Sequence, residues 1–446
     1  MTLTPWAGIA IVVTALLGML ALLRTLRSRF GLHPELTRKM AHVGIGLASL
    51  SYPWLFREPW PVVLLGALAV STLLALRLIP VVRDSVGGVV NGVNRSSAGD
   101  LYFPIAATGL FLLSRGDPVL YSIPILTLAT ADAVAALVGV FYGHFKFEGA
   151  EGKKSLEGSA AFVLVAFLAT HVPLLLFTSV GRAESLLIGL TFGLLVMILE
   201  AVAWRGLDNL FIPFGGFLLL RAFLALNAPA LLARLLVTLA LLVLVVTMRR
   251  RRTLTDAAVL AGVLIGYVAW SVGGWRWLVP PLVLFLLYTL LWPRTYQLRE
   301  RPHDVTAVLS VTGWGMLWLL LATVLGKPEL YYPYTLTFAA NLAFIGIGWL
   351  RDYRRRESVW RAILVSAVMA WAALLVPYLL AVGATPATLT QAAVALVPLL
   401  VGGVAYVLAI PRRPHTAPSR DFPWTRQAML GLGASALGWA LVSLRP

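Results

Sequence analysis

Cysteine is absent from this 446-residue sequence, and charged residues are scarce. Without cysteine there can be no disulfides, thiolate metal sites or thiol catalysis. Charged residues make up 12% and apolar residues 59%, whereas soluble domains carry about 25% charged residues, so an ordinary soluble enzyme is excluded. Acidic residues are the scarcest charged class, 19 against 36 basic ones, which leaves a net charge of +17. Such a surplus is typical of proteins that bind nucleic acid or anionic lipid, but in a membrane protein it also sets orientation.

Long apolar runs fill the sequence from end to end. Each is near the length of about 20 residues that a helix needs to cross a bilayer, and none shows the ten-residue alternation of a β-barrel strand. The sequence therefore predicts an all-α, polytopic integral membrane protein with about 16 transmembrane helices. The expected spans are residues 5–23, 40–56, 60–79, 101–114, 118–141, 159–179, 184–203, 211–226, 229–247, 256–272, 277–292, 306–325, 332–350, 361–382, 388–410 and 427–443.

Basic residues alternate between the connections in a way that supports this topology. Of the 36, 28 fall in connections that follow odd-numbered spans or at the adjoining span ends, where Arg77 and Arg361 lie. Because Lys and Arg collect in cytoplasmic loops, these connections are expected inside and both termini outside. The charge surplus is then explained by orientation, and we expect no nucleic-acid partner. The arginine run 249–252 divides the sequence into two expected transmembrane domains, 1–248 and 249–446.

Lysine is much rarer than arginine, and its placement is uneven. The sequence has 31 Arg and 5 Lys, and three of the lysines, Lys146, Lys153 and Lys154, lie within nine residues. A compact ammonium group suits phosphate binding, so the clustering favours a phosphate site over a merely solvated loop. The surrounding segment 143–159 holds four glycines, and Gly149, Gly152 and Gly158 would let backbone amides approach an anion beside a helix N-terminus. The spacing differs from that of a Walker A loop.

Asp132 lies inside the fifth expected span. A carboxylate within a membrane span indicates a functional site by default, although one hydrogen-bonded between helices is the structural alternative. If the span is helical, Asp132 lies about 15 Å from its cytoplasmic end, so either the site is a cavity open to the cytoplasm or the span ends early and bends inward. Gly139 and Gly143 follow on the same helical face.

Three further polar clusters are expected on the cytoplasmic side. Glu200, Asp208 and Asn209 surround the seventh connection, where oxygen ligands suit Mg²⁺, although Asp208 or Asn209 also suits a helix N-cap. Arg38, Lys39 and His42 begin the second span, and a histidine there is either a catalytic group or a hydrogen-bonded structural residue. The segment 95–104 precedes the fourth span.

At these residues the sequence resembles the dolichol kinase and phytol kinase family, integral membrane enzymes that use CTP to phosphorylate isoprenoid alcohols. The resemblance covers roughly residues 30–230. The family also includes CTP-dependent diacylglycerol kinases, so the lipid acceptor stays open. The matching motifs, in family order, are Arg38-Lys39-x-x-His42, Arg95-x-x-x-Gly99-Asp100 with Phe103-Pro104, Asp132-Ala-x-Ala with Gly139 and Gly143, Lys153-Lys154-Ser-Leu-Glu157-Gly158-Ser159, and Asp208-Asn209-Leu with Pro213.

The resemblance implies transfer of the γ-phosphoryl group of CTP to a lipid alcohol, with Mg²⁺, at the cytoplasmic face of a bacterial or archaeal cell membrane. We expect catalytic roles for His42, Asp132, Lys153, Lys154, Glu157 and Asp208. Metal ligands are expected among Asp132, Glu157 and Asp208, and the alternative role for Asp132 is to orient or deprotonate the alcohol. The nucleotide is expected to contact Arg38, Lys39, Arg95, Lys146, Gly149, Gly152, Lys153, Lys154, Ser155 and Gly158.

The second half, near residues 250–350, is faintly similar to the phytyl phosphate kinase family. It lacks that family's acidic signature around Phe338–Ala343, so we expect a non-catalytic domain. Two other functions compete with a kinase. A phosphatidate cytidylyltransferase also uses CTP, but its His-Gly-Gly and paired Asp-Arg motifs are missing. A transporter would place polar residues at the midplane of both halves, whereas the acids of the second half lie at span ends or in loops.

Overall fold

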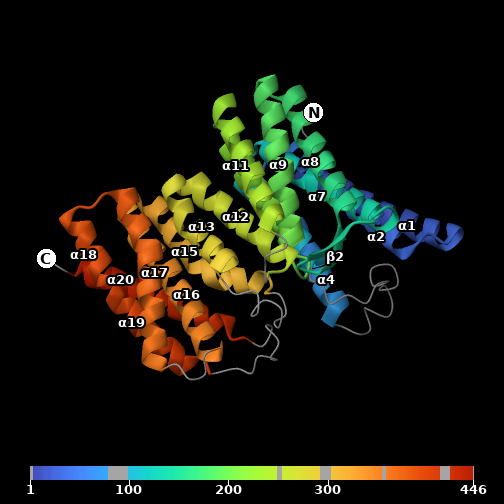
Figure 1. The fold of residues 1–446 in the computed structure, drawn as a ribbon. Coiled ribbons are helices and arrows are strands. Elements are labelled where there is room, and N and C mark those ends of the chain that lie inside the picture. Colours follow the sequence, from blue (N-terminus) through green and yellow to red (C-terminus); the bar gives the residue numbers. More distant parts are fainter. Residues whose placement is uncertain are drawn as a thin grey trace. The chain divides into compact units, whose positions relative to one another are not determined.

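The computed structural model describes residues 4–78, 99–248, 254–291, 303–353, 358–411 and 422–444. It separates into two compact units, residues 1–238 and 239–446. The boundary falls inside helix α11 (Ala228–Met248), whose last residue is where the sequence predicts the first domain to end. Figure 1 shows the order of the elements within each unit.

Helices dominate the first unit. In chain order they are α1 (Pro5–Phe30), α2 (Pro34–Leu50), α3 (Tyr52–Leu55), α4 (Trp60–Leu78), α6 (Gly99–Ser114), α7 (Pro118–Phe141), α8 (Leu156–Phe177), α9 (Arg182–Val202), α10 (Asp208–Phe223) and α11. Helix α7 packs against α2, α8 and α10, so it lies at the centre of the unit. Close packing depends on small residues: a Cβ added to Gly46 of α2 would lie 2.3 Å from the Cβ of Ala129 on α7.

The second unit contains helices α12 (Asp256–Gly273), α13 (Trp275–Leu291), α15 (Val305–Leu325), α16 (Tyr331–Tyr353), α17 (Val359–Val382), α18 (Pro386–Val394), α19 (Leu396–Ala409) and α20 (Trp424–Ser443), with a short 3₁₀ turn at Pro328–Leu330. Its core surrounds α16, which packs against α15, α17, α19 and α20. Asn341 of α16 is 1% exposed and donates to Val311 O and Thr337 O, while Gln427 of α20 donates to Asn341 Oδ1. The segment Phe338–Ala343, which lacks the acidic signature, is therefore buried between the helices of this unit.

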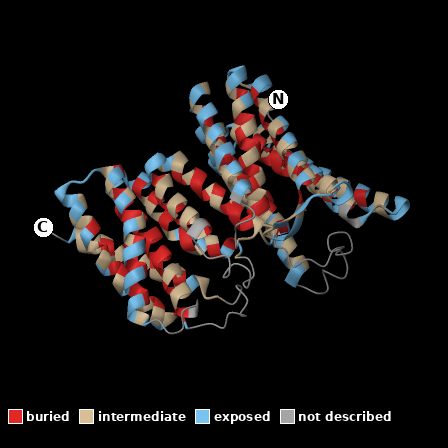
Figure 2. Cartoon of the chain, in the orientation of Figure 1, coloured by how far each residue is buried: buried red, intermediate tan, exposed pale blue. Residues whose placement is uncertain are grey.

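Ten helical segments of the described residues are long and apolar enough to cross a membrane, and three shorter apolar helices accompany them. One of the ten, Pro386–Ala409, combines α18 and α19. Large apolar side chains such as Leu17, Phe177 and Leu408 are exposed on the helix surfaces, which suits contact with lipid. Figure 2 shows these exposed positions beside the buried residues inside each unit. The helical membrane fold is confirmed, while the count of 16 spans and the sides of the termini stay predictions.

One element departs from an all-helical fold. Strands β1 (Lys146–Gly149) and β2 (Gly152–Ser155) form an antiparallel hairpin in the lysine-rich segment, with Lys146 opposite Ser155 and Gly149 opposite Gly152. Gly152 has φ +84°, a left-handed conformation that glycine adopts without steric cost. The hairpin leads directly into α8, whose N-cap is Ser155.

Candidate functional site

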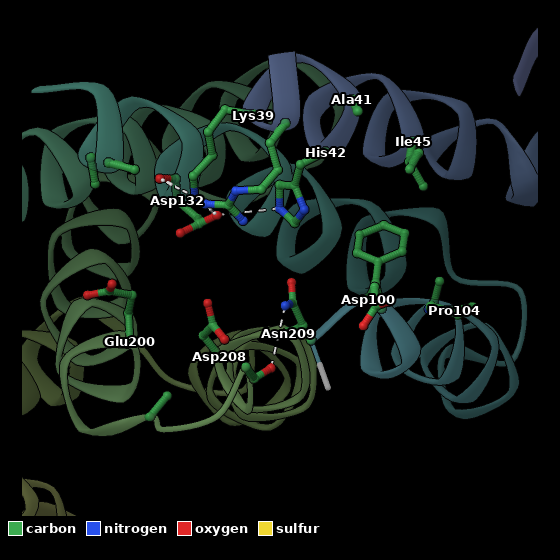
Figure 3. A pocket seen from close by; sticks show the side chains of 18 of the residues that line it. Lys39, Ala41, His42, Ile45, Asp100, Pro104, Asp132, Glu200, Asp208 and Asn209 are labelled. Carbon is green, nitrogen blue, oxygen red and sulfur yellow. Dashed lines mark hydrogen bonds and ion pairs between the residues drawn. The ribbon is translucent and has the colours of Figure 1, made fainter. Parts of the chain in front are cut away.

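A cavity of about 1290 Å³ opens among helices α1, α2, α4, α6, α7 and α10, the hairpin and the end of α9, all within the first unit. This exceeds the roughly 300–1,000 Å³ of common small-molecule pockets, so the cavity has room for more than one ligand. Figure 3 shows its polar part, where side chains from α2 and α7 face those of α9 and α10.

Asp132 of α7 and Lys39 of α2 form an ion pair in this cavity. Lys39 Nζ lies 2.6 Å from Asp132 Oδ2, and the two residues are only 5% and 9% exposed. A buried charge is costly unless it is paired, so each side chain compensates the charge of the other. The sequence predicted both residues as site members but not their pairing.

His42 lies one helical turn beyond Lys39 on α2. Its Nε2 is 3.3 Å from Leu128 O and 3.6 Å from Asp132 Oδ2, and its ring meets Phe103 edge-on. When Nε2 carries a proton it donates to the Leu128 carbonyl. The same position leaves His42 beside the Asp132 carboxylate, so the geometry is compatible with both the structural and the catalytic role.

The hairpin brings the clustered lysines to the cavity. Lys154 Nζ contacts the carboxylate of Glu200 and donates to Glu200 O at 2.8 Å. The turn of the hairpin is held by two more bonds, from Ala150 N to Ala201 O and from Arg205 N to Glu151 Oε2. Lys146 and Lys153 line the same cavity. The hairpin and the α9–α10 connection are therefore joined, although about 50 residues separate them in the sequence.

The α9–α10 connection turns sharply at Arg205 and Gly206, with φ +54° and +82°. A left-handed conformation costs a non-glycine residue about 1–2 kcal/mol, so the bond from Arg205 N to Glu151 helps to maintain it. Beyond the turn, Asp208 and Asn209 point from α10 toward Lys39, Asp132 and His42 (Figure 3). The N-cap of α10 is Leu207, so the alternative that Asp208 or Asn209 caps this helix is wrong.

Oxygen ligands gather at this side of the cavity. Burial raises the pKa of Asp208, the first residue of α10, to about 6, and repulsion by Asp132 and Glu200 adds to the rise. Asn209 donates to Gly206 O at 3.4 Å, while its Oδ1 is buried and accepts no hydrogen bond from the described residues. No group of three or more His, Cys, Asp or Glu side chains in the described part of the chain could hold a metal by itself. Asp208 and Asn209 fit Mg²⁺, which proteins bind through few side chains together with substrate phosphates.

Comparison with known proteins decides the family. Over 223 residues the chain is 31% identical to a phytol kinase of Synechocystis sp., a match that takes in 92% of that protein and 49% of this chain. The chain belongs to the phytol kinase family. No family model matches it, and no solved structure matches it.

Other residues that the resemblance to phytol kinases suggested have structural contacts. Ser155 Oγ accepts from Gly158 N, which caps α8. A Cβ on Gly158 would lie 2.8 Å from Ala135 O, so this glycine lets α7 and α8 pack closely. One on Gly143 would lie 2.8 Å from the Cβ of Ser155, so this glycine lets the end of α7 approach the N-cap of α8. Ser155 and Gly158 also line the cavity, whereas Gly149 and Gly152 form the hairpin turn and do not.

Glu157 is not brought into the cavity. Its Oε1 accepts from the backbone amides of His144 and Phe145 at 3.1 Å each, which ties the start of α8 to the residues before the hairpin. This contact gives Glu157 a structural role, and its role as a metal ligand stays a prediction. Arg38 lines the cavity, and Arg95 lies outside the described residues.

Sequence reasoning did not single out Arg27, Arg77 and Glu151, which also line the cavity. Arg77 forms an ion pair with Asp100. The two arginines were counted as orientation signals because they lie at the ends of predicted spans. Both arginines are expected on the same side of the membrane as Lys39, and this shared side could have indicated that they belong to the site.

Proposed function

We propose that the protein is a CTP-dependent isoprenoid-alcohol kinase, which transfers the γ-phosphoryl group of CTP to the hydroxyl of phytol or a related polyprenol. The observation that carries this proposal is one cavity that holds the Lys39–Asp132 pair, the hairpin lysines and the Asp208–Asn209 pair. The kinship with the Synechocystis phytol kinase supports the acceptor class. We infer a site at the cytoplasmic face, on the basis of the charge distribution in the sequence.

In the reaction, the alcohol oxygen forms a bond to the γ-phosphorus as the bond from that phosphorus to the β–γ bridging oxygen breaks, and CDP leaves. Phosphoryl transfer depends mainly on positioning and charge neutralisation. Asp132, held by Lys39, is placed to accept a hydrogen bond from the alcohol and to take its proton. His42 borders this carboxylate and would help to orient the same hydroxyl.

The hairpin lysines supply the positive charge for the phosphates. Lys146, Lys153 and Lys154 line one side of the cavity, and Lys154 reaches it on a flexible stem from β2. Its ammonium contacts the Glu200 carboxylate and both residues line the cavity, so it can move from Glu200 to a phosphate oxygen. Arg38 and Lys39 add positive charge from α2.

Asp208 and Asn209 would hold Mg²⁺, which when bound would neutralise charge on the phosphate oxygens. The carboxylate of Asp208 and the free Oδ1 of Asn209 face the same part of the cavity as Asp132 (Figure 3). We assign the reaction to the first unit and a structural role to the second.

The test is a panel of donors and acceptors assayed with the full-length protein in lipid nanodiscs. CTP and ATP are each offered with phytol, a polyprenol and diacylglycerol, and phosphorylated lipid is measured. We expect CTP with an isoprenoid alcohol to give the highest rate. Preference for diacylglycerol would change the assignment to a diacylglycerol kinase. Absence of phosphorylated product with every donor and acceptor would overturn the proposal that the protein is a lipid kinase.

A further inference from the structure

The cavity extends beyond its polar part along α2. From His42 the lining continues through Ile45 and Ser49 to Tyr52 at the start of α3. Ten residues of helix correspond to about 15 Å, so the lining extends about this far along α2. Figure 3 shows Ile45 beyond His42 on the side away from Asp132. We call the part of the cavity between Ile45 and Tyr52 the apolar branch.

The walls of the apolar branch present almost no free polar groups. Leucines of α1 and α4, among them Leu20 and Leu73, line it opposite α2. Two of its hydroxyl side chains are hydrogen-bonded within their own helices, because Ser49 Oγ donates to Ile45 O at 2.9 Å and Thr72 Oγ1 to Leu68 O at 2.8 Å. The hydroxyls of Thr108 and Tyr52 also belong to the lining. A nucleobase needs polar partners in its pocket, so these walls suit a hydrocarbon instead.

Aromatic side chains close the far end of the apolar branch. Tyr52, 8% exposed, stacks on Tyr121 with ring centroids 6.3 Å apart and meets Phe56 edge-on at 5.8 Å. Tyr121 is fully buried, donates from its hydroxyl to Ser49 O at 3.0 Å and packs against Phe111. These rings contact one another on several sides, so they form a rigid end to the branch.

We propose that the apolar branch binds the hydrocarbon chain of the alcohol and that the ring of Tyr52 sets the upper limit of chain length. This rests on the proposed function, because the hydroxyl of the same molecule would lie at Asp132. We identify the occupant from the fact that Asp132 and the apolar branch line one and the same cavity. A molecule with its hydroxyl at Asp132 can therefore extend its hydrocarbon chain into the branch.

Two phenylalanine substitutions on α4 test the apolar branch. Ala69 lines the cavity, whereas Ala67, two residues earlier on the same helix, is exposed and does not. Ala69→Phe and the matched control Ala67→Phe are assayed with CTP and a series of alcohols of increasing length: geraniol, farnesol, phytol and a dolichol. We expect Ala69→Phe to lower kcat/KM for phytol at least about tenfold relative to geraniol, with the KM for CTP unchanged. Ala67→Phe is expected to keep the wild-type length profile.

A second substitution removes bulk at the end of the apolar branch instead of adding it. Tyr52→Leu shortens the side chain, and we expect it to raise kcat/KM for the dolichol relative to phytol. Wild-type length profiles in both Ala69→Phe and Tyr52→Leu would overturn the apolar branch. If Tyr52→Leu does not fold, the Ala69→Phe and Ala67→Phe comparison decides alone. Failure of the wild-type protein to phosphorylate any alcohol would instead overturn the proposed function, so the two failures are distinguishable.

Discussion

Lys39 Nζ lies 2.6 Å from Asp132 Oδ2, although 93 residues separate the two in the sequence. The ion pair fastens α2 to α7 at the point where the cavity changes from polar to apolar. It therefore has two consequences, one for stability and one for the placement of the reacting hydroxyl.

Removing one partner of this pair should cost more stability than removing both. Lys39→Met leaves the Asp132 carboxylate buried and unpaired, which typically costs about 3–5 kcal/mol. The double variant Lys39→Met, Asp132→Asn removes both charges and should unfold at a higher temperature than Lys39→Met, while both lack activity. Thermal unfolding in detergent and phosphorylation of phytol are the two measurements. Equal unfolding temperatures in the wild type and Lys39→Met would show that the pair does not stabilise the fold.

The hairpin lysines should govern affinity for the nucleotide. Replacing Lys153 and Lys154 together by alanine removes two charges from the phosphate side of the cavity. We expect the KM for CTP to rise at least about tenfold, the effect of losing roughly 1.4 kcal/mol of binding. Lys327→Ala, in the second unit, is the matched control and should behave as the wild type. Full activity of the double variant would refute the hairpin as the phosphate site.

Gly152 should affect CTP binding only through its backbone conformation. It has φ +84°, and a Cβ added there would meet open space. Gly152→Val should therefore strain the turn and displace Lys153 and Lys154, whereas Gly152→Asn, which tolerates positive φ better, should do so less. We expect the KM for CTP to increase in the order wild type, Gly152→Asn, Gly152→Val. Identical KM values for the three proteins would mean that the turn does not position the lysines.

Asp208 and Glu157 should respond differently to Mg²⁺. Asp208→Asn removes the charge expected to bind the metal, so more Mg²⁺ should be needed for half-maximal activity. Glu157→Ala removes the acceptor of two backbone amides and should lower the unfolding temperature without changing the Mg²⁺ requirement. Titration of activity with Mg²⁺ in both variants separates the two roles. The reverse pattern would restore Glu157 as the metal ligand.

The sequence predicted the helical membrane fold because apolar runs of this length have few other solutions. It located most of the charged residues of the cavity, because Asp132 interrupts an apolar run and the lysines cluster in one connection. It missed the hairpin, whose register depends on the turn at Gly152 and on docking of Ala150 against Ala201. The Lys39–Asp132 and Lys154–Glu200 pairs were also missed, because each joins residues that only tertiary packing brings together. Glu157 is a further case, because the sequence did not predict that its carboxylate accepts hydrogen bonds from the backbone amides of His144 and Phe145.

The central claim is that the γ-phosphoryl group of CTP moves to an isoprenoid alcohol. Its most direct test uses the purified full-length protein, phytol, and CTP radiolabelled at either the γ- or the α-phosphate. The account predicts labelled phytyl phosphate from γ-labelled CTP only, with CDP as the second product. Label in the lipid from α-labelled CTP, with release of pyrophosphate, would identify a cytidylyltransferase and contradict the account.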